Sequence, residues 1–256
     1  MVLRGKPVGE QGAADRWTAF RYQAETQQRA PSGAFFVIKR GGFMFTLFLI
    51  GNIASGKSTA ARYLEGRGAR RIDLDTMAKD LYVPGSDVVH DLAEAFGYDI
   101  LAADGGIAAR VLAQRAFSSP EQTALLNSIV HPVLLRHLSD ILLPVNCCST
   151  VVPRYPLTVV EVSAAASFRA AFDLADEIIA VTASCEIRRA RALERGMSPD
   201  DFDARSEVQP SEEELCSMAD AVLDNTKADD SLFAALDAWL ASKNIYLSTL
   251  DDVSHA

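Results

Sequence analysis

One loop limits the possible folds of this chain more than any other feature. The apolar run FTLFLI at residues 45–50 is too short for a helix and rich in strand formers, so it predicts a buried strand of a parallel sheet. The segment GNIASGKS follows at residues 51–58, and residues 58–65 have the pattern of a helix. A buried strand, the pattern G-x-x-x-x-G-K-S and a helix, in this order, predict a phosphate-binding loop.

Each residue type in this loop suits the binding of a nucleoside triphosphate. Glycines allow the backbone angles that aim several N–H groups at the phosphate oxygens, and the start of the helix adds its unpaired amides. Lys57 supplies a positive charge for the β- and γ-phosphates, and the Ser58 hydroxyl is placed to ligate Mg²⁺. A glycine turn that matches the pattern by chance is the alternative. The residues expected to contact the nucleotide are Gly51, Asn52, Ile53, Ala54, Ser55, Gly56, Lys57, Ser58 and Thr59.

The rest of the chain alternates between strand and helix patterns. Further strands are predicted at residues 70–75, 157–162, 177–183 and 221–224. Residues 76–142 show apolar spacings of three and four, which predict mostly helix, and helices are also expected between and after the last strands. This alternation predicts an α/β fold, a three-layer sandwich around a parallel sheet.

Composition excludes several classes of protein. The net charge of −9 argues against a protein that coats nucleic acid, and no apolar run reaches the roughly 18 residues of a membrane span. The four cysteines show no C-x-x-C spacing, so we expect no disulfide or zinc framework and a reduced, cytoplasmic setting. Residues 1–43 carry seven lysines and arginines against three acids and lack periodicity. We interpret them as a dispensable, disordered extension, with the folded domain beginning at Met44.

Two aspartates follow the second predicted strand. Asp73 and Asp75 lie two positions apart, so on a strand they would point to the same side, near the phosphate loop. A carboxylate there can accept a proton from an attacking hydroxyl or hold the Mg²⁺ shell. Strand-end or helix-capping aspartates are an equally good interpretation of the pair.

Arginines recur on one later helix. Arg188, Arg191 and Arg195 follow spacings of three and four and so share a helix face, and Arg205 on the next helix could join them. A solvated basic face is the ordinary interpretation of this pattern. Arginines on a mobile cap can also neutralise the charge of a phosphoryl group in transfer.

Motifs over about 200 residues from Met44 resemble, in order, those of the bacterial dephospho-coenzyme A kinase family, a branch of the nucleoside-monophosphate-kinase-like P-loop proteins. The motifs are GNIASGKST, IDLDTMAKDLYVPGS, EAFGYDILAADGGI, RAFSSPE, IVHP, RALERGMSPDDFDARSEVQ and ADAVLDNT. The resemblance implies a P-loop kinase fold and ATP-dependent phosphorylation of the ribose 3′-hydroxyl of dephospho-CoA, the last step of coenzyme A biosynthesis. It implies ATP, Mg²⁺ and dephospho-CoA as ligands, with no nucleic-acid or membrane partner.

The resemblance also divides the chain into regions. The implied regions are a P-loop kinase domain at 44–243, an inserted helical acceptor-binding region at 76–150, a lid at 188–212 and a C-terminal tail at 244–256. His131, in the HP pair, is expected to be structural. The oligomeric state stays open.

Single residues receive roles from the same resemblance. Asp75 would be the base for the 3′-hydroxyl, and Ser58 would be the Mg²⁺ ligand. Arg191 and Arg205 would be lid residues, and the segment around Asn225 would lie against the adenine of ATP. The implied catalytic residues are Asp75, Lys57 and Arg191.

The chain departs from the family pattern at three places. The family usually has glycines where Asn52 and Ala54 stand, so Ala54 must adopt a compatible backbone angle or the loop is remodelled. The family's Pro-Leu-Leu-x-Glu run, near the acceptor, is replaced by SAAAS at residues 163–167. An arginine of the family's D-G-x-x-x-R stretch is Ala109 here, next to Arg110.

Other functions stay open beside this kinase. A P-loop kinase of the same architecture could act on another hydroxyl, because the SAAAS segment changes the acceptor region. A degenerate member could bind nucleotide without turning it over. A nucleotide-dependent switch is disfavoured, because GTPases read guanine through an Asn-Lys-x-Asp segment that this sequence lacks.

Overall fold

The computed structural model describes residues 44–142, 155–227 and 229–247. The extension expected at residues 1–43, residues 143–150 of the expected acceptor-binding region and the end of the expected tail lie outside the described residues. Within the described ranges, no helix combines the length and the apolar character that crossing a membrane requires.

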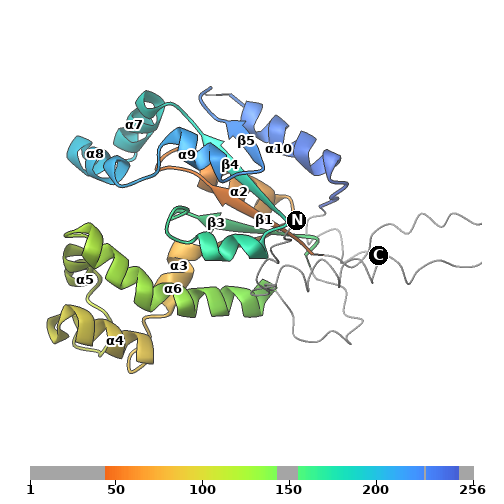
Figure 1. Cartoon of the computed structure of the whole chain (residues 1–256). Coiled ribbons are helices and arrows are strands. Elements are labelled where there is room, and N and C mark those ends of the chain that lie inside the picture. The colour runs from red at the N-terminus through yellow and green to blue at the C-terminus, as the bar shows by residue number, and fades with distance from the viewer. Residues whose placement is uncertain (1–43, 143–154, 228, 248–256) are drawn as a thin grey trace, which may run out of the picture. The chain divides into compact units, whose positions relative to one another are not determined.

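A five-stranded parallel sheet forms the centre of the fold (Figure 1). The strands are β1 Phe45–Ile50, β2 Arg70–Asp73, β3 Leu157–Val162, β4 Glu177–Thr182 and β5 Ala221–Asp224. Their spatial order is β2-β3-β1-β4-β5, so β1 lies in the middle and β3 lies between β1 and β2. β3 and β4 are buried along their whole length, as expected for a sheet that is covered on both faces.

Helices cover both faces of the sheet. They are α2 Lys57–Gly66, α3 Leu74–Asp80, α4 Asp87–Phe96, α5 Ala109–Ala116, α6 Pro120–Leu142, α7 Cys185–Glu194, α8 Pro199–Glu207, α9 Glu212–Ser217 and α10 Ser231–Ser242, with 3₁₀ helices η1 Tyr98–Ile100 and η2 Arg169–Leu174. Side chains alternate along β1, so Leu47 and Leu49 pack with α2 and α10 while Phe48 and Ile50 pack with the helices between β2 and β3. Three layers result, which confirms the predicted α/β sandwich.

The second strand is shorter than predicted. β2 ends at Asp73, whereas the sequence pattern placed Asp75 on the strand as well. The Asp73 carboxylate accepts hydrogen bonds from the backbone N–H groups of Asp75 and Thr76, at 3.0 and 3.2 Å, and so begins α3. The capping interpretation is therefore correct for Asp73, and the expectation that both aspartates point to one side of a strand is wrong.

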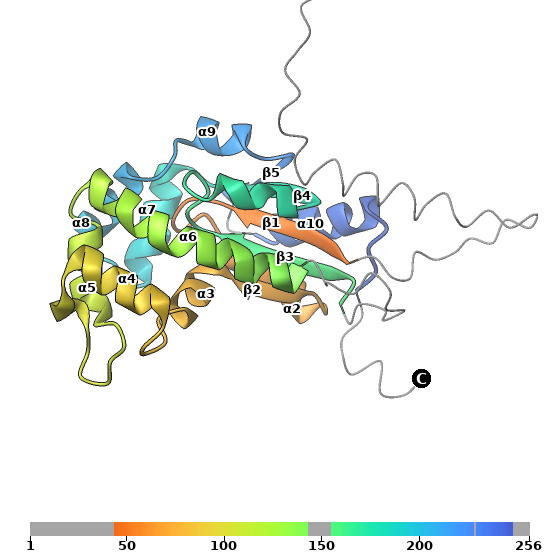
Figure 2. The same ribbon diagram turned by 60° about the horizontal axis from the view of Figure 1, so that its bottom comes forward.

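A mostly helical stretch follows β2, with an isolated β-bridge between Leu101 and Ile107. The described part of the region 76–150 consists of α3, α4, η1, α5 and α6, and Figure 2 shows α4 and α5 beside α6. The histidine of the HP pair, His131, lies inside α6, and its ring packs against Phe168 with a centroid distance of 4.8 Å. This contact agrees with the structural role expected for His131.

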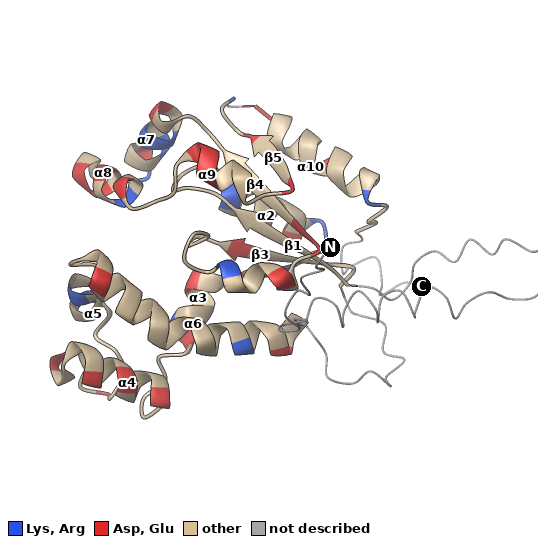
Figure 3. Ribbon diagram, in the orientation of Figure 1, with Lys and Arg blue, Asp and Glu red and all other residues tan. Residues whose placement is uncertain are grey.

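Helices α7 and α8 follow β4 and pack against each other. Figure 3 shows basic side chains on α7, all of them arginines, and mostly acids on α8. Arg189 of α7 pairs with Asp203 of α8 at 3.0 Å. Ser198 caps α8 through the amide of Asp201. A capping box of Ser211 and Glu214 begins α9, as its sequence pattern predicts.

Candidate active site

Two glycines shape the loop between β1 and α2 because no side chain fits at their positions. A Cβ on Gly51 would lie 2.7 Å from the carbonyl oxygen of Val181. Gly56 has φ +106°, and a Cβ there would lie 2.0 Å from the side-chain nitrogen of Asn225. The spacing of the two glycines in the motif therefore follows from contacts with β4 and with the end of β5.

Ala54 occupies a third special backbone position. Its φ is 60°, in the left-handed region that favours glycine. The compatible backbone angle expected for this alanine is therefore present. A left-handed conformation costs a residue with a Cβ roughly 1–2 kcal/mol, so the loop carries this strain.

Asn225, which directly follows β5, fixes the phosphate loop through hydrogen bonds. Its buried side-chain nitrogen donates a hydrogen bond of 2.7 Å to the carbonyl oxygen of Ser55. Its own backbone carbonyl accepts a hydrogen bond of 2.8 Å from Arg191. The end of β5, the loop and α7 are therefore joined through one residue.

An open pocket of about 250 Å³ lies beside the loop. Gly56 and Thr59 line it from the loop and α2, and Leu232 and Phe233 supply apolar surface from α10. Arg191 reaches the same pocket, and its second terminal nitrogen is buried with no hydrogen-bond partner among the described residues. The pocket thus combines an apolar wall with the guanidinium group of an arginine.

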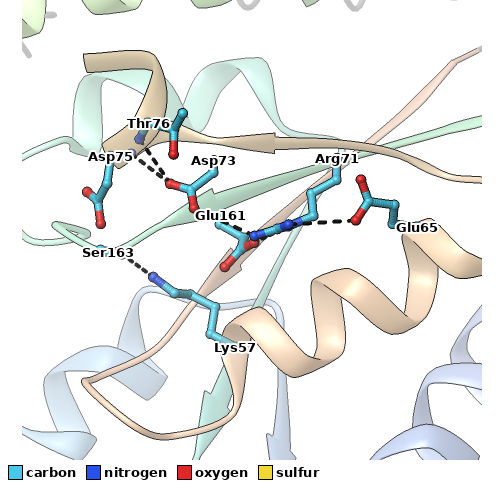
Figure 4. Close-up of polar contacts among 8 residues, drawn as sticks. All are labelled: Lys57, Glu65, Arg71, Asp73, Asp75, Thr76, Glu161 and Ser163. Carbon is cyan, nitrogen blue, oxygen red and sulfur yellow. Dashed lines mark hydrogen bonds and ion pairs between the residues drawn. The ribbon is translucent and has the colours of Figure 1, made fainter. Parts of the chain in front are cut away.

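The ammonium group of Lys57 lies in a cluster of polar side chains (Figure 4). Lys57 is 7% exposed, and its Nζ donates a hydrogen bond to the hydroxyl of Ser163. Burial lowers the pKa of Lys57 below its ordinary value, although the carboxylates of Asp75, Glu161 and Asp73 favour the charged form and oppose the shift. The loop lysine is therefore a desolvated charge held among acids.

Asp75 lies in the first turn of α3 and is exposed. In Figure 4 its carboxylate points toward the place where Ser163 and Lys57 meet. The part of the chain that the structure describes provides no hydrogen-bond or ion-pair partner for this carboxylate, whereas the neighbouring Asp73 is engaged in capping α3. Asp75 is therefore the acid of this pair that is available to a ligand.

Glu161 and Arg71 are site residues that sequence reasoning missed. Glu161 lies on β3, is 2% exposed and accepts a hydrogen bond from Arg71. Arg71 also lies 3.6 Å from carboxylate oxygens of Asp73 and Glu65. A single acid inside the apolar run LTVVEV was the signal, because a buried carboxylate needs a partner.

The arginines of α7 turn toward the loop. Arg188 donates a hydrogen bond of 3.4 Å to the carbonyl oxygen of Ile53, and Arg191 reaches Asn225 as described. Arg195 lines the pocket beside Gly56. Arg188 and Arg191 of α7 and Arg195 directly after the helix therefore lie on the side that faces the loop, as their spacing predicts.

Two other basic residues behave differently. Arg189 forms the ion pair with Asp203, which is the solvated arrangement that the ordinary interpretation describes. Arg205 is exposed on α8, and within the described ranges it forms no hydrogen bond or ion pair. The structure therefore brings Arg191, but not Arg205, to the loop.

The segment after α8 also contacts the loop, and sequence reasoning missed this contact. The Asn52 side chain donates to the carbonyl oxygen of Pro210, and the Ile53 amide donates to Oε1 of Gln209, both at 2.9 Å. Both ends of the region 188–212 are thus joined to the loop. Asn52, which stands where the family usually has glycine, was the available signal, because its side chain needs a hydrogen-bond partner outside the loop.

Comparisons with known proteins extend over most of this chain. The sequence profile of the dephospho-CoA kinase family matches residues 45–230. A dephospho-CoA kinase of Corynebacterium diphtheriae is 37% identical over 191 residues, which cover 72% of this chain and 90% of that relative. Another from Mycobacterium bovis is 35% identical over 77% of this chain, which spans 47% of that relative. The solved structure of TT1252 from Thermus thermophilus has a TM-score of 0.62 at 30% identity and covers 78% of this chain and 97% of its own.

Proposed function

The chain belongs to the dephospho-CoA kinase family, and we propose that it transfers the γ-phosphoryl group of ATP to the ribose 3′-hydroxyl of dephospho-CoA with the residues described above. The observation that carries the proposal is the meeting of a phosphate loop and a free carboxylate. The ammonium of Lys57 and the carboxylate of Asp75 both face the loop that begins at Ser163 (Figure 4).

The donor site in this proposal is the loop with its neighbouring pocket. Backbone amides between Ala54 and Ser58 and the start of α2 bind the phosphates. The pocket between Gly56 and Phe233 has room and apolar surface for a base, which supports the expectation that adenine lies near Asn225. Arg191, which lines this pocket, supplies a cationic group for phosphate oxygens.

Catalysis then consists of a proton transfer and an in-line displacement. The Asp75 carboxylate takes the proton of the 3′-hydroxyl as its oxygen bonds to the γ-phosphorus, and the bond to the β–γ bridging oxygen breaks to release ADP. Lys57 and Arg191 balance the charge on the phosphoryl oxygens. Lys57 is suited to this task because desolvation strengthens the interaction of its charge with the phosphates.

The donors present suit Mg²⁺, which prefers oxygen ligands and neutralises charge on the phosphates. Ser58 is the second residue of α2, and in the described residues its hydroxyl has no hydrogen-bond partner. We therefore propose Ser58 as the protein ligand of Mg²⁺, with the Asp75 carboxylate nearby.

The acceptor is proposed to bind against the helices between β2 and β3, with residues 188–212 as a lid. Asp75 begins the first of these helices. The lid residues proposed to approach the nucleotide are Arg191 and Arg205. Arg205 has to move or be met by the ligand, because it is exposed and has no partner among the described residues.

A coupled assay of ADP release tests the function. Dephospho-CoA is compared with nucleosides, nucleoside monophosphates and an acceptor-free control. Release with dephospho-CoA far above the acceptor-free rate, with coenzyme A as product, is expected. Release no faster than that rate would count against the proposal.

A faster reaction with another alcohol would instead favour the second candidate, a kinase whose acceptor pocket is changed by the exposed Ala164, Ala166 and Ser167.

A further inference from the structure

We propose that Ser163 is a positioning residue for Lys57. Its hydroxyl holds the Lys57 ammonium away from Asp75, so that the lysine charge stays available to the phosphates and the Asp75 carboxylate stays available as the base. The inference rests on the proposed kinase function and concerns a residue to which neither the loop motif nor the comparisons assign a role. Three observations support it: the place of Ser163 in the sheet, its contact with Lys57, and the state of the surrounding acids.

The order of the strands places Ser163 between the donor and acceptor groups. β3 lies between β1, which leads into the phosphate loop, and β2, which leads to Asp75. In the parallel register Val162 pairs with Ile50, so Ser163 leaves the sheet level with Gly51. Glu161 pairs with Asp73, so Ser163 also leaves the sheet beside the turn that carries Asp75.

The hydroxyl of Ser163 accepts a hydrogen bond from Nζ of Lys57 (Figure 4). A hydroxyl is a neutral acceptor, so it fixes the ammonium without neutralising its charge. An ammonium has three N–H donors, and two of them remain for phosphate oxygens. Ser163 can therefore keep this contact while the nucleotide is bound.

The acids around Lys57 show why a neutral acceptor matters here. The carboxylates that act on the ammonium are Asp75, Glu161 and Asp73. Glu161 is engaged by Arg71, and Asp73 caps α3 and also faces Arg71.

Asp75 is therefore the free acid that could pair with Lys57 among the described residues. In such an ion pair the Lys57 charge would be neutralised and unavailable to the phosphates, and the Asp75 lone pairs would be unavailable to the proton of the acceptor hydroxyl. The Ser163 hydroxyl offers Lys57 another partner at the same place, and this separates the two functions.

The test compares Ser163→Ala and Ser163→Thr with the wild-type chain, and Ser242→Ala serves as a control. Ser242 lies on α10, where its hydroxyl donates to the carbonyl oxygen of Trp239. We expect Ser163→Ala to lower kcat about tenfold or more, as for loss of a hydrogen bond to a charged group, while the KM for dephospho-CoA changes much less. Ser163→Thr keeps the hydroxyl and should restore most of kcat, and Ser242→Ala should match the wild type.

The affinity for ADP provides a readout that does not depend on turnover. In Ser163→Ala the Lys57 ammonium is released to pair with Asp75, so we expect ADP binding by calorimetry to weaken about tenfold, whereas Ser163→Thr and Ser242→Ala should bind ADP like the wild type. Loss of kcat together with weaker ADP binding supports the inference. A Ser163→Ala variant with wild-type kcat, or with wild-type ADP affinity, overturns it. If the wild type shows no turnover with dephospho-CoA, the proposed function fails, and the ADP affinities still decide whether Ser163 positions Lys57.

Discussion

The side-chain nitrogen of Asn225 donates a hydrogen bond of 2.7 Å to the backbone carbonyl oxygen of Ser55, across 170 positions of sequence. The same amide nitrogen occupies the space that a side chain on Gly56 would need. The phosphate loop therefore owes its shape to the end of β5 as well as to its own glycines. Changes at Asn225 should alter nucleotide binding even though this residue lies outside the loop motif.

The variant Asn225→Asp tests this relationship. In this variant a carboxylate oxygen replaces the amide nitrogen that donates to the Ser55 carbonyl oxygen. The hydrogen bond is therefore lost, and two oxygens repel each other at this place. We expect about a tenfold loss of ADP affinity by calorimetry and a free energy of unfolding lower by about 1–3 kcal/mol. Asn244→Asp, at an exposed position after α10, is the matched control and should change neither quantity. Wild-type ADP affinity in Asn225→Asp would show that the loop holds its shape without this contact.

The two loop positions with positive φ should respond in opposite ways. Ala54→Gly relieves the strain of an alanine at φ 60°, but glycine loses more entropy on folding, so we expect a stability change within about 1 kcal/mol and nucleotide affinity no weaker than wild type. Gly56→Ala places a Cβ 2.0 Å from the Asn225 nitrogen at φ +106° and should abolish measurable ADP binding. Calorimetry with ADP and urea unfolding of both variants check this. Equal ADP affinities would contradict the assigned loop geometry.

Much of the fold follows from patterns that are local in the sequence. The strands at residues 157–162 and 221–224 have the predicted bounds, because short apolar runs between turns leave few alternatives. The capping box of Ser211 and Glu214 is equally local. The end of β2 was misplaced because an aspartate can either end a strand or cap a helix. Its side chain decides between these, and here Asp73 bonds to the amides of α3.

The candidate site was only half predictable, for a physical reason. Gly51, Lys57 and Ser58 belong to one continuous motif, and its chemistry can be derived from residue types alone. The contact of Lys57 with Ser163 and that of Ile53 with Gln209 join residues 106 and 156 positions apart. Strand order and register decide such contacts, and a single sequence does not contain the register.

The variant Asp75→Asn tests the proposed base. An amide has nearly the same shape as a carboxylate but cannot take the proton of the acceptor hydroxyl, so turnover should fall by roughly 10²-fold or more. ADP binding should stay nearly intact because the loop is unchanged. Asp80→Asn, an exposed change at the other end of α3, is the control and should turn over like the wild type. Unchanged turnover in Asp75→Asn would remove this carboxylate from the mechanism.

His131 should make stability depend on pH. Its ring lies 4.8 Å from Phe168, and burial lowers its pKa below the ordinary 6.5, although a hydrogen bond with the backbone of Ser167 opposes the shift. As the pH falls, the unfolded chain therefore binds this proton at a higher pH than the folded protein does. The contribution of His131 to the free energy of unfolding is fully present above pH 6.5 and is lost as the pH falls below 6.5. The loss amounts to about 1.4 kcal/mol for each unit by which the folded and unfolded pKa values differ. Urea unfolding on both sides of pH 6.5 should show a smaller loss in His131→Gln than in the wild type, while His137→Gln, an exposed change on the same helix, should keep the wild-type dependence. The same loss in His131→Gln as in the wild type would mean that this ring is not the group that titrates.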